Sequence, residues 1–407
     1  MCAYIIIMPL IQEKVNYKGV PISDILLGII IIGYTLGIVF FRDIRKRFID
    51  GIMDFFTNKL TIFMAVLLAV MMVSSVYAVD KSLALKESFR FLTYLLIYFT
   101  IRYEFNTINA ITILLKCYIG TSAILCIFGI VQHFTTWGLD KKFNVSYASG
   151  YRVVRIAATM YNPNAYAAYL ILIIFPVIML SIYEKKLKIK LIYTLISILI
   201  FVNLIMTYSR NALLGFAVGA VLLGLLYSWK LIIAFGFVGT SLMFIPSVFD
   251  RTKDIPNALQ NASRLKLWKT ALMMIKEHPI LGVGNGNFVT RYNEYVSKYK
   301  DLKYYEYQNY PSHNSYLKVQ SELGIIGIVS FLGILVTALF RVKKLYSTTS
   351  EVFHKAFYMG VMASIAAFLF MNLSDNLFFV PKATTYFWFL LATVEALLNS
   401  RPKESVL

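Results

Sequence analysis

One histidine occupies a position that suits acid–base chemistry. His313 lies in the segment NYPSHNSYL, among Ser312, Asn314 and Ser315, where a long polar segment meets the next apolar run. The other three histidines follow an apolar run, precede a proline or lie in a basic loop, so structural or solvated roles explain them. A histidine held among polar groups can act as a base near neutral pH. The alternative for His313 is a hydrogen-bonded residue at the start of the next helix.

Three arginines lie where their charge could bind an anion. Arg210, in MTYSRNALLGF, falls in a short turn between apolar runs, and Arg264, in QNASRLKLW, opens an amphipathic stretch. A guanidinium can bind two phosphate oxygens, and a helix start capped by Ser263 would add free N–H groups. Arg155 precedes a helix start that contains Asn164, where capping is the ordinary explanation. The alternatives are an Arg210 that reaches lipid headgroups and a solvated Arg264.

Acidic and aromatic residues leave more than one role open. Glu322 and Asp375 lie within or near apolar runs, as proton relays or as paired interior groups. Acids and histidines are too scattered to form a recognisable metal-ligand spacing. Tyrosines concentrate in one polar segment, where they suit sugar rings or anchoring at a membrane interface: Tyr292, Tyr295, Tyr299, Tyr304, Tyr305, Tyr307 and Tyr310.

The composition shows what kind of protein must position these residues. Of 407 residues, 58% are hydrophobic and only 15% charged, and the mean hydropathy is +0.67. Soluble domains carry about 25% charged residues, so this chain is expected to be a polytopic membrane protein. Three cysteines exclude a disulfide scaffold, and the apolar content excludes disorder. The net charge of +19 comes mainly from basic residues beside apolar runs, which indicates lipid headgroups rather than nucleic acid.

Apolar runs long enough to cross a bilayer, which takes about 20 residues, recur along the chain. The run with the most charges is 84–101, and the short run 3–11 is expected to be a twelfth, tilted span. The eleven clear runs are 22–41, 60–79, 84–101, 108–131, 165–183, 189–207, 211–228, 231–249, 317–340, 355–373 and 383–399.

The charges of the loops set the expected orientation. The loops 42–59, 184–190 and 341–355 are strongly basic and fall on one side, which the positive-inside rule makes cytoplasmic together with both termini. The loops 132–164 and 250–316 then lie on the outer face. The expected organisation is helices one to nine over 1–249, the large outer loop over 250–316, which carries substrate-binding and catalytic residues, and helices ten to twelve over 317–407.

Three segments together resemble the O-antigen ligase and polysaccharide polymerase family. They are RIAATMYNPNAYAAYL, TYSRNALLGFAVG, and the large loop from SRLKLWKTALMMIKEHPILGVGNGNF to HNSYLKVQSELGIIG. The last is the most specific, with His-Asn, then Tyr-Leu, then Glu-x-Gly-x-x-Gly. The resemblance covers roughly residues 150–330, and the rest agrees only in the number of runs.

The resemblance implies an all-α, GT-C-like membrane glycosyltransferase with about twelve spans, in the bacterial cytoplasmic (inner) membrane. It would move a glycan from an undecaprenyl diphosphate carrier to an acceptor hydroxyl on a saccharide, lipid core or protein. Transfer would occur on the outer face, with inversion and without metal or cofactor, in the biosynthesis of a surface polysaccharide such as lipopolysaccharide. Polymerase and ligase differ only in the acceptor, and these motifs do not separate them.

On the family pattern, His313 matches the base that activates the acceptor. Arg210 and Arg264 match arginines that hold the diphosphate. Arg155 and Asn164 match polar positions in the same cavity, and Asn314 is expected to bind substrate beside the histidine.

The chain departs from the commonest pattern at 156–159, Ile-Ala-Ala-Thr, where runs with glycine are more usual, so the role of 155–164 is open. The alternative function is a multi-span transporter or a flippase for lipid-linked glycans. Such a protein should show paired repeats with polar groups near the bilayer midplane. Here the polar groups gather at one face and in one loop, which favours the transferase.

Overall fold

The computed structural model of the chain describes residues 1–12, 16–17, 20–140, 144–148, 151–160, 162–242, 244, 249, 258–303 and 310–400. Seven described helices are long and apolar enough to cross a membrane: α2 (Ile22–Phe40), α4 (Lys59–Tyr77), α6 (Ile108–Thr135), α8 (Pro163–Tyr183), α9 (Leu187–Met206), α15 (Ser315–Thr348) and α16 (Val352–Met371). The expectation of a polytopic helical membrane protein is confirmed. The GT-C-like class stays a prediction, and the count of twelve spans required the short run 3–11 to cross the bilayer.

The remaining elements are shorter, less apolar or polar. Those beside the long helices are α1 (Cys2–Leu10), α3 (Arg42–Phe55), α5 (Lys81–Glu104), α10 (Arg210–Leu226), α11 (Lys230–Leu242) and α17 (Pro381–Asn399). The connecting segments contain α13 (Ala258–Glu277), α14 (Phe288–Lys298) and the 3₁₀ turns η1 (Lys300–Leu302) and η2 (Leu377–Phe379). Two antiparallel pairs join β1 (Asn16–Tyr17) to β2 (Val20–Pro21) and β3 (Val145–Ala148) to β4 (Tyr151–Val154).

Several expected boundaries differ from the structure. The run 3–11 forms α1, but nine residues rise only about 14 Å, against a hydrocarbon core of about 30 Å. A full span there was therefore a wrong expectation. The basic segment 42–59 contains the amphipathic helix α3 instead of an irregular loop. The expected span 231–249 is represented by α11, which ends at Leu242.

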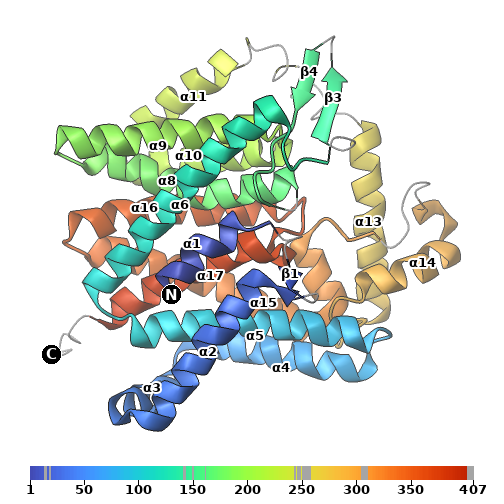
Figure 1. The fold of residues 1–407 in the computed structure, drawn as a ribbon. Coiled ribbons are helices and arrows are strands. Elements are labelled where there is room, and N and C mark those ends of the chain that lie inside the picture. Colours follow the sequence, from blue (N-terminus) through green and yellow to red (C-terminus); the bar gives the residue numbers. More distant parts are fainter. Residues whose placement is uncertain are drawn as a thin grey trace.

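The helices run in roughly one direction, and the connecting segments gather at two ends (Figure 1). α13, α14 and the β3–β4 hairpin lie at the right-hand end in that view. α3, the α8–α9 turn and the α15–α16 turn lie at the opposite end. The three basic segments thus share one end of the molecule, as their alternation along the chain requires.

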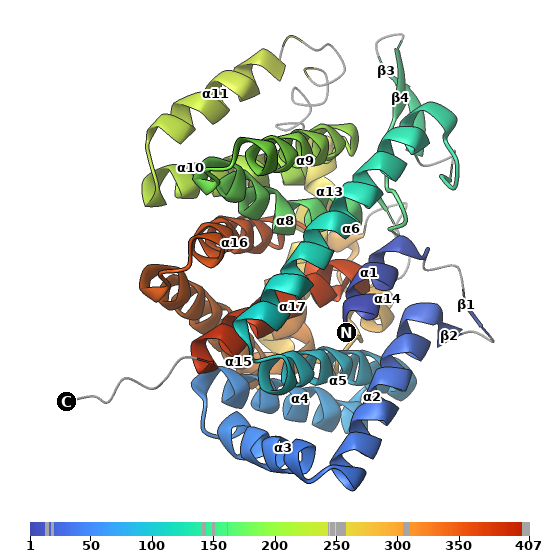
Figure 2. The ribbon, with the colours of Figure 1, turned by 60° about the vertical axis from the view of Figure 1, so that its left-hand side comes forward.

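α8 lies at the centre of the bundle. It packs against α16, α9 and α10, and Figure 2 shows it between α9 and α16. Sixteen of its residues are buried, and Gly360 of α16 lets the two backbones approach, because a Cβ there would lie 2.4 Å from the carbonyl oxygen of Phe175. By contrast only Leu27 and Gly37 of α2 are buried, and apolar side chains such as Ile29 and Ile32 are exposed. An apolar surface of this kind suits contact with lipid.

A break in α15 lets the glycine-rich segment 282–288 form hydrogen bonds with this helix. Gly324 has φ +63° and ψ −159°, so the helix is interrupted there and the carbonyl oxygens of Ser321 and Glu322 are released. They accept hydrogen bonds of 2.9 Å from the N–H groups of Val283 and Gly284. A side chain at residue 324 would place Cβ 2.0 Å from the carbonyl oxygen of Ile280, so glycine is required.

Candidate active site

The site centres on a contact between His313 and Asp375. His313 Nδ1 lies 3.2 Å from the Asp375 Oδ1, and the two side chains are 23% and 12% exposed. His313 precedes α15, and Asp375 lies in the turn between α16 and η2, so the fold joins residues 62 positions apart. His313 has φ +48°, a conformation uncommon outside glycine, and its carbonyl oxygen accepts a hydrogen bond from Trp268. Strained backbone of this kind clusters at functional sites.

Asn164 and Arg155 extend this contact into a chain of four side chains. Asn164 Nδ2 donates to Asp375 Oδ2 at 3.1 Å, and Arg155 Nη2 donates to Asn164 Oδ1 at 3.4 Å. Arg155 also donates through Nε to the carbonyl oxygen of Thr207, at 3.1 Å. Both Asp375 oxygens are therefore occupied, one by the histidine and one by the amide. We call these four residues, His313, Asp375, Asn164 and Arg155, the site network.

Local helix signals place Asn164. Asn162 caps α8 by accepting a hydrogen bond from the N–H of Ala165 at 2.9 Å, and Pro163 is the first residue of the helix. Asn164 therefore points from the first turn of α8 toward the turn that carries Asp375. The capping chemistry expected from the sequence is present, and it positions a residue of the site.

The charges around Asp375 keep it ionised. Burial opposes ionisation, but the hydrogen bond and charge of His313, the N–H of Asn376 and the charge of Arg264 together hold the Asp375 pKa below its ordinary value. The influence of Arg264 shows that its charge acts on this carboxylate from α13. Arg264 itself is partly exposed.

The helix start expected at Arg264 lies elsewhere. α13 begins at Ala258, six residues earlier, so Arg264 projects from the second turn and no helix N-terminus faces an anion there. The expectation of a cap at Ser263 was wrong, because this residue lies inside the helix. The side chain of Ser263 is outside the described residues.

Arg210 is the first residue of α10, directly after the cap Ser209. Its neighbour Asn211 donates through Nδ2 to the carbonyl oxygen of Met371, at 2.8 Å, which ties the start of α10 to the end of α16. Three residues before it, Thr207 receives the bond from Arg155. The structure thus brings the α10 start beside the site network, with the Arg210 side chain partly exposed.

Asn314 has a structural task. Its Oδ1 accepts hydrogen bonds of 3.0 Å from the N–H groups of Tyr316 and Leu317, so it caps α15. Its Nδ2 donates to the carbonyl oxygen of Leu373 at 2.9 Å, and the residue is buried. These bonds account for Asn314 without a ligand, and they fix the residue next to His313 against the turn that carries Asp375.

Glu322 is a paired interior group. Its oxygens accept hydrogen bonds from the N–H groups of Gly286, at 2.9 Å, and Phe288, at 3.1 Å, and it also pairs with Lys318. The carboxylate therefore holds the glycine-rich segment against α15, and of the two roles open from the sequence this is the one the contacts describe. The same segment reaches α5, where Asn285 Nδ2 donates to Ser88 Oγ at 3.1 Å.

The tyrosines of the large loop divide by position. Tyr292 and Tyr295 are buried in a small core between α13 and α14, so sugar stacking on their faces was a wrong expectation. The ring centroid of Tyr310 lies 5.4 Å from that of His313, so this tyrosine lies beside the site network. Tyr304, Tyr305 and Tyr307 lie outside the described residues.

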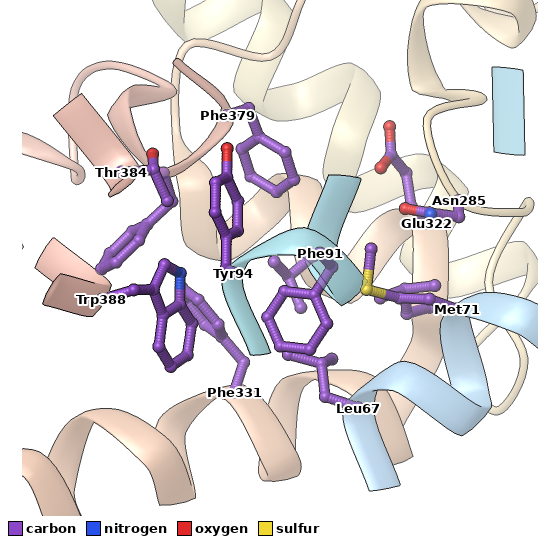
Figure 3. Close-up of a pocket in the computed structure, with 13 residues that line it drawn as sticks. Leu67, Met71, Phe91, Tyr94, Asn285, Glu322, Phe331, Phe379, Thr384 and Trp388 are labelled. Atoms are coloured by element: carbon purple, nitrogen blue, oxygen red, sulfur yellow. The ribbon is translucent and has the colours of Figure 1, made fainter. Parts of the chain in front are cut away.

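A small apolar cavity lies between the helices and is too small for a substrate. It measures about 40 Å³ and is lined mainly by aromatic and aliphatic side chains of α4, α5, α15 and α17, with Glu322 and Asn285 at one side (Figure 3). A volume of this size holds little more than one water molecule.

Comparison with known families identifies part of the chain. Residues 195–332 match the family model described as O-antigen ligase. We refer to these residues as the O-antigen ligase domain, after the family that they match. It runs from within α9 to within α15 and contains Arg210, Arg264 and His313. The resemblance to the O-antigen ligase and polymerase family is thereby confirmed, and a multi-pass membrane protein of this kind is established. No curated protein matches the chain.

The O-antigen ligase domain is completed by residues on both sides of the match. Arg155 and Asn164 precede it and Asp375 follows it, yet all three are linked to His313 by a chain of contacts of 3.1 to 3.4 Å. From the sequence Asp375 was only an interior acid of undecided role. The signal that could have found it is an acid in a short polar turn, NLSDN, between two apolar runs. Among the described residues no group of three acids, histidines or cysteines is placed to hold a metal ion.

Proposed function

We propose that the protein is a membrane glycosyltransferase. It moves a glycan from an undecaprenyl diphosphate carrier to an acceptor hydroxyl on the outer face of the bacterial cytoplasmic membrane, as a surface-polysaccharide polymerase or an O-antigen ligase. The observation that carries this proposal is the His313–Asp375 contact at one end of the bundle. The positive charge of Arg264 also helps to lower the pKa of Asp375. The matched O-antigen ligase domain supports it.

His313 serves as the base in this proposal. Asp375 accepts a hydrogen bond from the N–H at Nδ1 and stays ionised. Nε2 is then the nitrogen that takes the proton of the acceptor hydroxyl. Asp375 also stabilises the imidazolium that forms, in the manner of other carboxylate–histidine pairs. Asn164, held by Arg155, fixes the second oxygen of the carboxylate and so orients the pair.

The chemical step needs charge stabilisation more than a strong acid. The acceptor oxygen attacks the anomeric carbon of the donor sugar, and the bond from that carbon to the diphosphate oxygen breaks. The electron pair leaves with the polyprenyl diphosphate, and Arg210 and Arg264 stabilise its charge. Attack from the face opposite the diphosphate inverts the anomeric centre. Arginines can supply this stabilisation without a metal ion, so EDTA should not inhibit.

The orientation is part of the proposal. The basic end of the bundle, with α3 and the α8–α9 and α15–α16 turns, is placed in the cytoplasm by the positive-inside rule. The site network then faces the outer leaflet, where lipid-linked glycans meet their acceptors. A cysteine introduced beside Lys276 should react with a membrane-impermeant thiol reagent in intact cells, and one in the α8–α9 turn should not.

The decisive experiment sizes the lipid-linked glycans of cells that lack this protein by mass spectrometry. Single repeats that accumulate indicate a polymerase, and long chains that remain on the carrier indicate a ligase. Restoration by the wild-type gene but not by a His313→Ala variant of equal abundance supports the assigned site. Repeats trapped on the inner leaflet would contradict a transferase and indicate a flippase.

A further inference from the structure

A second cavity lies between α1, α2, α5 and the start of α17, apart from the site network. Its volume is about 410 Å³, within the range of roughly 300 to 1,000 Å³ typical of ligand sites. It is ten times larger than the apolar cavity of Figure 3, and its lining is mixed. Apolar residues such as Met8 and Phe89 stand beside polar and charged ones, of which the most informative are Gln12, Asp24, Lys86, Arg90 and Lys382.

Two cations on one face of α5 define the cavity. Lys86 and Arg90 are four residues apart, so their side chains lie on the same side of the helix. Arg90 Nη1 pairs with Glu87 at 3.0 Å, and Lys86 has no ion pair with any other described residue. The remaining guanidinium N–H groups and the ammonium can therefore bind an anion. Phosphate suits this arrangement, because guanidinium binds its oxygens in a bidentate manner.

The opposite wall offers groups that bind hydroxyls. Gln12, Ser23 and Asp24 come from the end of α1 and the start of α2, and Thr385 comes from α17. Tyr94 lines both this cavity and the apolar one, and its buried hydroxyl has no hydrogen-bond partner among the described residues. An unpartnered buried hydroxyl carries a desolvation cost that a bound ligand would relieve.

Lys382 belongs to the wall. Its Nζ donates to the carbonyl oxygen of Thr159, at 2.8 Å, and also to that of Ile11. Lys382 therefore links the wall of the cavity to the segment that precedes Asn164. The cavity shares no lining residue with the site network.

We infer that this cavity binds the phosphorylated headgroup of a lipid. The phosphate lies against Lys86 and Arg90, its attached hydroxyls face Gln12 and Asp24, and the hydrocarbon chain follows the exposed apolar side of α2. Both a glycerol phospholipid and a polyprenyl phosphate carry this chemistry. The inference does not depend on the proposed transfer reaction.

Binding is tested on the full-length protein by native mass spectrometry. Phosphatidylglycerol and a polyprenyl phosphate are titrated separately, with phosphatidylcholine as the zwitterionic reference. The double variant Lys86→Ala, Arg90→Gln should weaken binding of the anionic lipid by about tenfold or more, because its two charge-assisted contacts are lost. Tyr94→Phe should weaken it by less. The matched control Lys276→Ala removes an exposed lysine of α13 that does not line the cavity, and should bind like the wild type.

Comparison of the two titrations identifies which lipid carries the bound phosphate. Preference for phosphatidylglycerol assigns a membrane phospholipid, and preference for the polyprenyl phosphate assigns a carrier lipid. Either preference supports the site if it is lost in the double variant and kept in Lys276→Ala. The inference is overturned if the double variant has the thermal stability of the wild type and binds each lipid as tightly as the wild type does. A His313→Ala variant that binds normally but transfers nothing separates this result from the proposed function.

Discussion

At the scale of residues, the structure turns isolated candidates into one connected network. His313, Asn164 and Arg155 were candidates from the resemblance, and Asp375 is the residue that joins them. A histidine alone could be a helix cap, whereas His313 also contacts a buried carboxylate through Nδ1, which is the contact that the proposed mechanism uses to orient the ring. Asn314 takes the capping role that was the alternative for its neighbour.

Asp375→Asn should lower the rate of transfer by about 10²–10⁴-fold, similar to His313→Ala, because an amide lacks the charge that orients and stabilises the imidazolium. The rate is measured with purified protein and a lipid-linked donor. The substrate KM should change little, since neither residue binds the donor diphosphate in the proposed mechanism. A variant that keeps more than half of the wild-type rate would remove Asp375 from the mechanism.

Arg210→Lys should also reduce transfer strongly, although the positive charge is kept. Lysine is a point charge and cannot reproduce the two parallel N–H bonds of a guanidinium to a phosphate. The matched control is Arg291→Lys, since Arg291 pairs with Glu294 on α14 outside the site network. Comparable activity of both variants would show that Arg210 contributes only charge, or does not meet the donor.

At the scale of elements, the interrupted helix α15 and the segment 282–288 form one unit. The family signature Glu-x-Gly has a physical meaning here, because Glu322 and the break at Gly324 together hold the segment. Four N–H groups of the segment donate hydrogen bonds to α15, two to carbonyl oxygens and two to the carboxylate of Glu322. The unit fixes the N-terminal end of α15, and with it His313.

Gly324→Ala should destabilise the protein by ~1–3 kcal/mol from backbone strain alone, with a further loss from the contact to Ile280. The thermal unfolding temperature of the solubilised protein measures this change, and transfer activity should fall with it. Gly120→Ala is the matched control, because a Cβ at that helical position meets no atom within 4 Å. If both variants unfold at the same temperature, the break is not required for stability.

α13 and α14 are joined by one carboxylate. Glu277 accepts hydrogen bonds from Lys298, at 2.7 Å, Tyr295, at 2.7 Å, and Tyr299, at 3.0 Å, and the first two lower its pKa the most, to about 2. A lowered pKa means that the ionised group stabilises the fold above its ordinary value of 4.5, and that this contribution is lost as the pH falls from 4.5 toward 2.

Glu277→Gln should therefore increase amide hydrogen exchange in α14 at neutral pH. The difference from the wild type should shrink as the pH is lowered from 4.5 toward 2, where the wild-type carboxylate itself becomes protonated. Exchange is followed by mass spectrometry with labelling times corrected for the slower intrinsic rate in acid. A difference that stays constant over this range would show that the charge of Glu277 is not what joins the two helices.

At the scale of the whole molecule, a buried charge cluster holds the end of the bundle opposite the site network. Glu395 of α17 is fully buried and accepts bonds from Arg341 of α15, with Nη2 to Oε2 at 2.6 Å. It also lies 3.5 Å from Arg102 of α5, which pairs with Asp54 of α3. Four helices from distant parts of the sequence meet at these charges.

Glu395→Ala should be among the most destabilising substitutions, with a loss of ~3–5 kcal/mol, because it leaves two arginines without their shared partner. Unfolding of the solubilised protein measures the loss. Glu294→Ala, which breaks the exposed pair with Arg291, should cost only about 0–1 kcal/mol. Similar effects of the two variants would mean that water or lipid replaces Glu395 at the arginines.

The sequence by itself determined the class of the protein, because apolar runs and flanking charges are local properties that a bilayer selects directly. Motifs contiguous along the chain also predicted the family that residues 195–332 match, and they marked the candidate arginines and histidine within these residues. The tertiary structure alone decided which acid meets His313, because Asp375 is 62 residues away and its partner depends on how α15, α16 and α8 pack. It likewise decided that Glu322 seats a loop and that α1 is too short to span, since the ends of helices and the partners of buried charges are set by contacts rather than by composition.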